Sequence, residues 1–208
     1  MILNLIFPVQ GEQIPLDHAY ALYGALSRII PEIHESGSAI RFAPIRGVKG
    51  APRRLHLTKD SRLILRLPIE QMRSAIPLAG KSLKLNDAHI RLGTPNVASL
   101  LPAPILTARM VTFKHADDWD KFLIAARKFL DVRGIRGQVS APIQRNSANP
   151  PRPLRRVVRI KNKTIYGYAL QISDLTDQES LDLQENGLGG RTKMGCGFFG
   201  PVRGKKNG

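Results

Sequence analysis

The order of the predicted strands and helices indicates an α+β protein built from two tandem ferredoxin-like (RRM-like) domains, residues 1–102 and 103–208. Each half follows the order β-α-β-β-α-β, and the second series begins after Pro102 and Pro104 interrupt the chain. The hydrophobic share of 42% is large enough for each half to bury a core. Because the two halves share no strong sequence repeat, the prediction depends on element order.

The first half opens with residues 2–9, an apolar segment of strand composition. Asp17 can cap a helix that runs to about residue 30, since four apolar side chains recur at helical spacing, and Pro31 ends that helix. The later elements are predicted to be a strand at 38–45, a hairpin of 54–58 with 62–67, a short helix at 68–77, and a hairpin of 82–85 with 88–92.

The second half opens with a predicted strand at 105–115 and a helix at 117–130, whose buried stripe includes Trp119 and Phe122. Thr176 and Glu179 have the spacing of a capping box, which predicts a second helix to about residue 186. The other predicted elements are a strand at 138–143, a hairpin of 154–161 with 164–173, and a last strand at 198–202 after a glycine-rich loop.

The chain is strongly basic, with 32 Lys and Arg against 16 Asp and Glu and a formal net charge of +16. A surplus of this size calls for a polyanionic partner, of which nucleic acid is the commonest. Residues 133–163 hold nine basic side chains, from Arg133 through Arg145 to Lys163, and no acidic one, whereas residues 164–185 hold five acidic and no basic side chains. We expect one face to meet phosphate; the alternative is a solvated basic face with no partner.

The single cysteine, Cys196, excludes a disulfide framework and a zinc site of paired cysteines, and it fits a reducing cytoplasm. No apolar stretch approaches the ~20 residues of a membrane span. Residues 1–9 lack a basic leader and a small-residue cleavage site, so they indicate a strand and not a signal peptide. We therefore expect a cytoplasmic protein with no membrane partner.

The sharpest motif is the segment 187–197, GLGGRTKMGCG, in which two glycine-hydrophobic-glycine pairs flank five residues. Glycine lets the backbone approach a ligand and expose successive N–H donors, and Arg191 and Lys193 add charge. The loop follows a helix and precedes a strand, so it can lie along a sheet and grip a phosphate backbone. The competing interpretation is a flexible turn, and the Gly-Lys-Ser/Thr order of a P-loop is absent from the segment.

This loop matches the GhGxxxxxGhG signature of the RAMP superfamily, the RNA-binding proteins of CRISPR systems. Together with two tandem ferredoxin-like halves, the chain resembles the CRISPR repeat-processing endoribonuclease family. A second point of resemblance is Ile33-His34-Glu35 after the first helix, where members of that family carry a catalytic histidine in a Leu-His-Glu-like setting. The specific motifs cover residues 17–47 and 187–200.

The resemblance implies a metal-independent endoribonuclease that binds the repeat hairpin of a CRISPR precursor RNA and cuts it by attack of a 2′-OH on the adjacent phosphate. It also implies that the mature guide RNA stays bound, with the protein as a subunit of a type I surveillance complex that serves antiviral defence or transposition. No cofactor is expected. The five histidines lack a short metal-binding spacing, so a zinc site is not expected either.

The catalytic candidates are His34, Arg41 and Ser27. Histidine serves as base or acid, an effect typically worth ~10²–10⁴-fold in rate, although a lone histidine at a helix end is more often a capping or surface residue. By resemblance, Ser27 takes the place of a helical Tyr, with Tyr23 and Tyr20 earlier on the same face. Arg41 takes the place of a Lys; arginine holds phosphate well but is a poor proton donor.

The RNA-binding candidates lie on the hairpin at 154–171 and in the glycine loop, where alternation on the hairpin places basic side chains on the open face of a sheet. With 6% aromatic residues, we expect recognition of backbone and shape more than base stacking. The candidates are Arg155, Arg156 and Arg159 on the hairpin, and Gly187, Gly189, Arg191, Lys193, Gly195 and Gly197 in the loop.

Three alternatives stay open. The first is a non-catalytic RNA-binding subunit of the same fold, in which His34 is a bystander, and the second is a basic RNA-binding protein unrelated to CRISPR, such as a ribosomal component. The third is a two-metal nuclease that uses the acids at 117, 118 and 120, although acids at a helix start commonly serve the helix dipole. If His34 is dispensable for cleavage, His18 and Tyr23 are the next candidates.

Overall fold

The computed structural model describes residues 1–144 and 151–202, so Arg145 of the basic segment lies outside the described residues. Contacts between Cα atoms divide the chain into two compact units. The first consists of Met1–Leu100, Val158–Thr164 and Lys193–Gly195, and the second holds the other described residues. No helix within the described ranges is long and apolar enough to cross a membrane.

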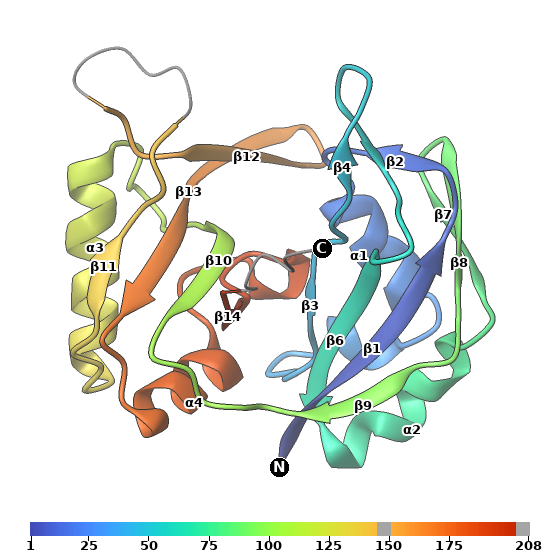
Figure 1. The fold of residues 1–208 in the computed structure, drawn as a ribbon, viewed down its shortest axis with the longest axis horizontal. Helices are drawn as coiled ribbons and strands as arrows, with labels where there is room; N and C mark the ends of the chain where they lie inside the picture. Colours follow the sequence, from blue (N-terminus) through green and yellow to red (C-terminus); the bar gives the residue numbers. More distant parts are fainter. Residues whose placement is uncertain (145–150, 203–208) are drawn as a thin grey trace. The chain divides into compact units, whose positions relative to one another are not determined.

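A six-stranded antiparallel sheet forms the centre of the first unit, in the order β3-β6-β1-β8-β7, with β9 also paired to β1 (Figure 1). The alternate side chains Leu3, Leu5, Phe7 and Val9 of β1 are buried, as the period of two along a half-covered strand requires. The strands are β1 (Ile2–Gln10), β3 (Arg41–Ala43), β6 (Arg62–Pro68), β7 (Ser82–Leu85), β8 (Ala88–Leu92) and β9 (Asn96–Ser99).

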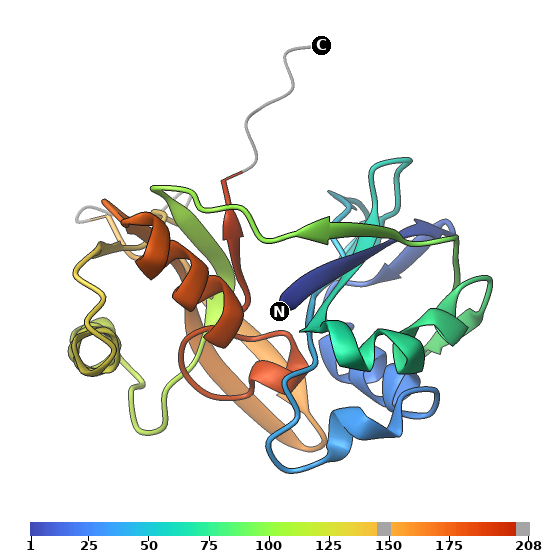
Figure 2. The ribbon, with the colours of Figure 1, turned by 90° about the horizontal axis from the view of Figure 1, so that it is seen from below.

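Helix α1 (Ala19–Ser27) and the short helix α2 (Met72–Ala75) lie on one face of this sheet (Figure 2). Leu22 and Leu26 of α1 are fully buried in the same core as the inward side chains of β1. The 3₁₀ turn η1 (Pro31–His34) follows α1, because proline can begin a helical turn but not continue the preceding helix. The predicted helix at 68–77 is a series of short turns, η2 (Ile69–Gln71), α2 and η3 (Ile76–Leu78).

One predicted hairpin of the first half is wrong. β5 (Arg54–His56) pairs with β2 (Gln13–Pro15) and β4 (Val48–Lys49) in a separate three-stranded sheet, and not with β6. β6 is flanked by β1 and β3, so neither of its edges is open to β5. The hairpin of β7 with β8 is confirmed, and β9 was not predicted.

The second unit contains a five-stranded antiparallel sheet in the order β11-β13-β10-β14, with β12 paired to β13. Helices α3 (Trp119–Val132) and α4 (Asp177–Asn186) contribute Phe122, Leu130 and Leu183 to its core. Two antiparallel sheets with two helices each confirm the predicted α+β, ferredoxin-like fold class. The strands are β10 (Leu106–Val111), β11 (Gln138–Ser140), β12 (Arg155–Ile160), β13 (Lys163–Ser173) and β14 (Phe199–Pro201).

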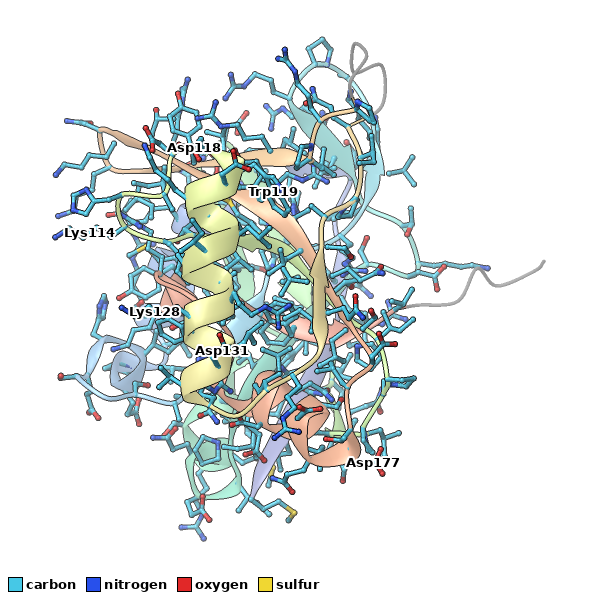
Figure 3. The ribbon with its side chains drawn as sticks, turned by 90° about the vertical axis from the view of Figure 1, so that its left-hand side faces the viewer. Lys114, Asp118, Trp119, Lys128, Asp131 and Asp177 are labelled. Carbon is cyan, nitrogen blue, oxygen red and sulfur yellow. The ribbon has the colours of Figure 1, made fainter. Side chains whose placement is uncertain are left out.

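Asp117 and Asp118, the acidic residues just before α3, stabilise the start of that helix; Figure 3 labels Asp118. Asp118 is the N-cap and accepts a hydrogen bond from the backbone N–H of Lys121 at 2.8 Å. Asp117 lies 3.1 Å from the Lys121 ammonium, whose hydrogen bond lowers the pKa of that carboxyl. The predicted capping box of Thr176 and Glu179 is also present at the start of α4.

Candidate functional site

His34 is exposed at the end of η1, and the turn that carries it is held on both sides. The preceding Ile33 is buried, with 1% of its surface exposed, and so anchors the turn to the core of the first unit. The carboxylate of Glu32 accepts a hydrogen bond of 2.5 Å from the Ser74 hydroxyl, which lowers the pKa of Glu32. The sequence therefore presents the imidazole on a fixed turn and not on a long loop.

Tyr23 on α1 meets this histidine. Its hydroxyl lies 2.7 Å from Nδ1 of His34, and the two rings meet edge to face with centroids 5.1 Å apart. Tyr20, one turn earlier on α1, stacks on Tyr23 at 6.5 Å between centroids. The rings of Tyr20, Tyr23 and His34 thus form a series of three, two on α1 and the last on the turn.

Lys193, from the glycine loop, donates a hydrogen bond from Nζ to the carbonyl oxygen of Glu35. Glu35 directly follows His34, so the ammonium adjoins the histidine turn. Lys193 was predicted only as an RNA-binding residue, and no spacing in the sequence indicated that it belongs beside residues 34 and 35. The structure brings a cation to the site from a segment 158 residues away in the chain.

Ser27 does not occupy the place beside the histidine that the motif comparison gave it. Its side chain is buried, with 6% exposed, and its hydroxyl donates a 2.6 Å hydrogen bond to the backbone carbonyl of Tyr23 in the preceding turn. The reserve residue His18 is 1% exposed, with Nδ1 2.9 Å from the carbonyl of Pro15. Arg41 lies on β3, opposite Arg66 in register, and its catalytic role stays a prediction.

The four glycines of the mirrored pairs all have left-handed backbones, with φ of 65° at Gly187, 81° at Gly189, 77° at Gly195 and 64° at Gly197. A Cβ on Gly187 would lie 2.5 Å from the carbonyl oxygen of Gly197, and one on Gly197 would lie 2.1 Å from that of Leu188. The mirrored spacing thus marks two backbone segments in direct contact within the second unit.

Several amide groups of this loop are engaged inside the protein. The N–H of Gly187 donates to Leu183 O at 2.9 Å, that of Gly190 to Thr112 O at 2.8 Å, and that of Gly197 to Met110 O at 2.8 Å. The glycine-rich composition predicted successive N–H donors exposed to a ligand. These three donors already have protein acceptors, so close packing explains these glycines better than anion contact does.

Arg133 of the basic segment is also engaged in the second unit. Its guanidinium donates to the Asp182 carboxylate at 3.0 Å, to the Asp182 carbonyl at 2.9 Å and to the Gly187 carbonyl at 2.6 Å. As the C-cap residue of α3, it therefore ties the end of that helix to the middle of α4 and to the start of the glycine loop. Charge counting along the sequence could not separate this structural arginine from those that face solvent.

The predicted hairpin candidates differ in their surroundings. Arg155 is exposed and lies 4.1 Å from the ring centre of Tyr166, a cation–π contact. Arg156 is partly buried, and burial lowers the pKa of its guanidinium. The backbone N–H of Arg159 donates to the Asp17 carboxylate at 2.8 Å, within the first unit, and its side chain is exposed.

Known proteins resemble this chain in sequence and in fold. A family model described as Cas6 Crispr matches residues 3–204. The chain belongs to the Cas6 family. The resemblance carried by the glycine loop and the Ile33-His34-Glu35 turn is thereby confirmed.

A curated relative from Myxococcus xanthus (strain DK1622), the CRISPR-associated endonuclease Cas6, is 40% identical over 201 residues, which are 97% of this chain and 82% of the relative. Among solved structures, a CRISPR associated protein Cas6 matches with a TM-score of 0.61 at 14% identity, covering 98% of this chain and all of the other. A Cas6-related protein from Pyrococcus furiosus also has a TM-score of 0.61 at 14% identity, covering 97% of this chain and 98% of that one. At these identities the structural likeness concerns the fold, and it agrees with the α+β class described above.

No group of three or more His, Cys, Asp or Glu side chains that could hold a metal ion occurs in the part of the chain that the structure describes. At this turn a phenol meets the imidazole of His34, and an ammonium donates to the backbone carbonyl of the next residue, Glu35. This set can exchange protons and carry positive charge.

Proposed function

We propose that this Cas6-family chain is an endoribonuclease that cuts the repeat hairpin of CRISPR precursor RNA and so produces guide RNAs. The name of the Myxococcus xanthus relative supports nuclease activity. The observation that carries the proposal is the exposed His34, hydrogen-bonded to Tyr23 and adjoined by the Lys193 ammonium. An exposed imidazole held by a phenol is suited to proton transfer with a bound substrate.

The proposed reaction needs no metal ion. The 2′-oxygen of one ribose attacks the adjacent phosphorus, the bond from phosphorus to the 5′-oxygen breaks, and the products carry a 2′,3′-cyclic phosphate and a 5′-OH. The 2′-OH loses a proton and the leaving 5′-oxygen gains one. Positive side chains stabilise the negative charge that develops on the phosphate in between.

His34 supplies one of the two proton transfers. Nδ1 is engaged by Tyr23, so Nε2 is the ring nitrogen that remains for the RNA. If the Tyr23 hydroxyl donates to Nδ1, Nε2 carries a proton and serves as the acid; if Nδ1–H donates to Tyr23, Nε2 is the base. Lys193, with Arg41 as the second candidate, neutralises the phosphate.

We assign the two parts of the sequence different tasks. Residues 1–102 carry His34, and residues 103–208 carry the basic hairpin and the glycine loop that hold the RNA. Arg155 and Arg156 on the hairpin grip the stem, and Arg159 near its tip binds the RNA beside the stem. The loop 187–197 follows the backbone near the cut through its two cations, Arg191 and Lys193. We further propose that the product stays bound and that the protein serves as a subunit of a type I surveillance complex.

The test uses a labelled repeat hairpin RNA incubated with wild type and His34→Ala in EDTA, alongside a substrate with a 2′-deoxy nucleotide at the cut site. Cleavage by wild type alone, abolished by the deoxy substitution, is the expected result. Tight binding without cleavage by either protein would contradict the enzymatic proposal and favour a non-catalytic RNA-binding subunit. Equal cleavage by both proteins would remove His34 from the site.

A further inference from the structure

A pocket of about 310 Å³ lies in the first unit, at the start of α1. Its walls come from segments that are distant in the sequence: the entry to α1, two turns of the N-terminal half and the tip of the β12–β13 hairpin. The lining residues that matter here are Asp17, Tyr20, Arg53, Asn86, Arg159 and Lys161. The volume is at the small end of ligand pockets, which suits one nucleotide and not a duplex.

The pocket is positively charged. Three basic residues line it, Arg53, Arg159 and Lys161, against one acidic residue, Asp17. That carboxylate already accepts the backbone N–H of Arg159 at 2.8 Å, so part of its charge is used to hold the hairpin tip. The surplus favours an anionic ligand, and a phosphate group is an anion that arginine and lysine side chains bind strongly.

The backbone at three of these positions is left-handed, with φ of 62° at Arg53, 59° at Asn86 and 53° at Lys161. Glycine adopts this conformation most easily, whereas a residue with a Cβ adopts it at a cost. Arg53 and Lys161 adopt it in spite of that cost, whereas asparagine adopts it more readily. Three turns that are distant in the sequence thus bring polar residues to one pocket.

Tyr20 connects the pocket to the candidate active site. Tyr20 lines the pocket, and its ring stacks on that of Tyr23 at 6.5 Å between ring centres; Tyr23 meets the imidazole of His34 at 5.1 Å. Stacked nucleotides follow one another at about 3.4 Å along a strand. The pocket and the imidazole are therefore only a few nucleotides apart.

We propose that this pocket binds one unpaired nucleotide of the substrate RNA, close in sequence to the cut. Its phosphate lies among Arg53, Arg159 and Lys161, its base stacks on Tyr20, and the Asn86 amide hydrogen-bonds the base edge. The inference rests on the proposed function and adds to it a specificity site, which fixes the cut relative to a single base. Aromatic stacking and an amide are the usual means of holding a base that has left its helix.

The test couples the protein to the RNA by paired changes. Repeat hairpin RNAs with a 2′-deoxy nucleotide at the cut and one abasic nucleotide at successive flanking positions are titrated with wild type, Tyr20→Ala, Tyr20→Phe and Asn86→Gly. Asn86→Gly removes the amide but retains the left-handed turn.

On wild type, one abasic position is expected to weaken binding by roughly 5- to 100-fold, the range that stacking on an aromatic ring gives. Tyr20→Ala is expected to weaken binding of the intact RNA by a similar factor and to show no further loss on that abasic RNA. Tyr20→Phe keeps the ring and the wild-type pattern. Asn86→Gly is expected to lower the preference for the natural base at the same position.

Two outcomes would overturn the inference, and they are distinguishable. If wild type cuts the natural hairpin but abasic losses and the Tyr20→Ala loss are additive at every position, the pocket does not hold a nucleotide while the proposed function stands. If wild type neither binds nor cuts the hairpin, the proposed function fails and this inference fails with it.

Discussion

At the scale of the residue, the His34 imidazole is placed by its neighbours on the turn and by one phenol. Ile33 is buried, Glu32 is bonded to Ser74, and Tyr23 contacts Nδ1 directly. A side chain held in this way has little freedom left to lose, which suits the proton transfer proposed for it. The hydroxyl that contacts the imidazole is a phenol on α1 and not that of the serine one turn later.

The first prediction separates those two hydroxyls. Tyr23→Phe should lower the single-turnover cleavage rate by about two- to tenfold, because it removes one hydrogen bond of ordinary strength from His34. Ser27→Ala should leave that rate within about twofold and change the free energy of unfolding by no more than about 1 kcal/mol, since the higher helix propensity of alanine offsets part of the lost hydrogen bond within α1. A larger loss of rate in Ser27→Ala than in Tyr23→Phe would return Ser27 to the site.

The sequence predicted the histidine but not its partners, for a geometric reason. Tyr23 and Ser27 are four residues apart on α1 and share a face, so spacing alone cannot decide which one reaches residue 34. In the fold, the Ser27 hydroxyl donates to the backbone carbonyl of Tyr23, and it is the Tyr23 hydroxyl that reaches His34. No local sequence pattern could predict the position of Lys193 beside this turn, because its contact with Glu35 is made only in the folded chain.

At the scale of the element, the glycine loop is built from close backbone contacts. Gly189 and Gly190 are adjacent but differ in what surrounds them. A Cβ on Gly189, with φ of 81°, would lie 2.5 Å from the carbonyl oxygen of Thr112, whereas one on Gly190 would meet nothing nearer than 3.7 Å. The two positions therefore form a matched pair for substitution: a Cβ is crowded at residue 189 and has room at residue 190.

The second prediction uses that pair. Gly189→Ala should lower the free energy of unfolding by about 2 kcal/mol or more, because a left-handed alanine costs about 1–2 kcal/mol before the contact with Thr112 is counted. Gly190→Ala should change it by no more than about 0.5 kcal/mol. Urea denaturation measures both. Equal stability of the two variants would show that the glycines do not serve packing.

The third prediction concerns the start of α4. The Glu179 carboxylate accepts hydrogen bonds from the backbone N–H groups of Arg136, at 2.6 Å, and Thr176, at 2.8 Å, which lower its pKa below the ordinary 4.5. A lowered folded-state pKa contributes stability that is complete above pH 4.5 and is lost as pH falls through the folded value.

The free energy of unfolding should therefore decrease on acidification below pH 4.5. Glu179→Gln, which keeps the capping geometry without the charge, should show a shallower decrease. Thr176→Ala should cost about 1 kcal/mol at neutral pH. Urea denaturation at a series of pH values measures all three, and an unchanged acid slope in Glu179→Gln would contradict the assignment.

Elements with local signals could be predicted, and those made by distant pairing could not. The β7–β8 hairpin and the α4 capping box depend on a few neighbouring residues, and both are confirmed. β5 carries strand-like residues next to β6, yet it pairs with β2 and β4 because β6 is already flanked on both sides. β9 pairs with β1 across most of the first half of the chain, a contact with no local signature.

At the scale of the whole molecule, charge is the dominant property. A formal net charge of +16 raises the local concentration of a polyanion and makes its binding depend on salt. Not every basic residue contributes in the same way. Arg133 is paired with Asp182 inside the second unit, whereas Arg155 is exposed and has no such carboxylate bond described.

The fourth prediction is a salt dependence. The logarithm of the affinity for repeat RNA should fall linearly with the logarithm of salt concentration, with a slope of about 0.7–0.9 per phosphate contact. Arg155→Ala should reduce that slope by about one contact, and Lys128→Ala should leave it unchanged. Fluorescence anisotropy between low and moderate salt measures it, and an identical slope in Arg155→Ala would remove the hairpin from the RNA interface.

The position of the single cysteine has a practical consequence. Cys196 lies between Gly195 and Gly197 in the tightly packed loop, and only 2% of its surface is exposed. A thiol reagent can reach the sulfur only when that loop opens, so the rate of modification under native conditions measures the free energy of opening. Because no other residue competes for the reagent, one mass increment follows the loop in the unaltered protein. Modification of Cys196 thus reports the opening of the segment on which the RNA is proposed to lie.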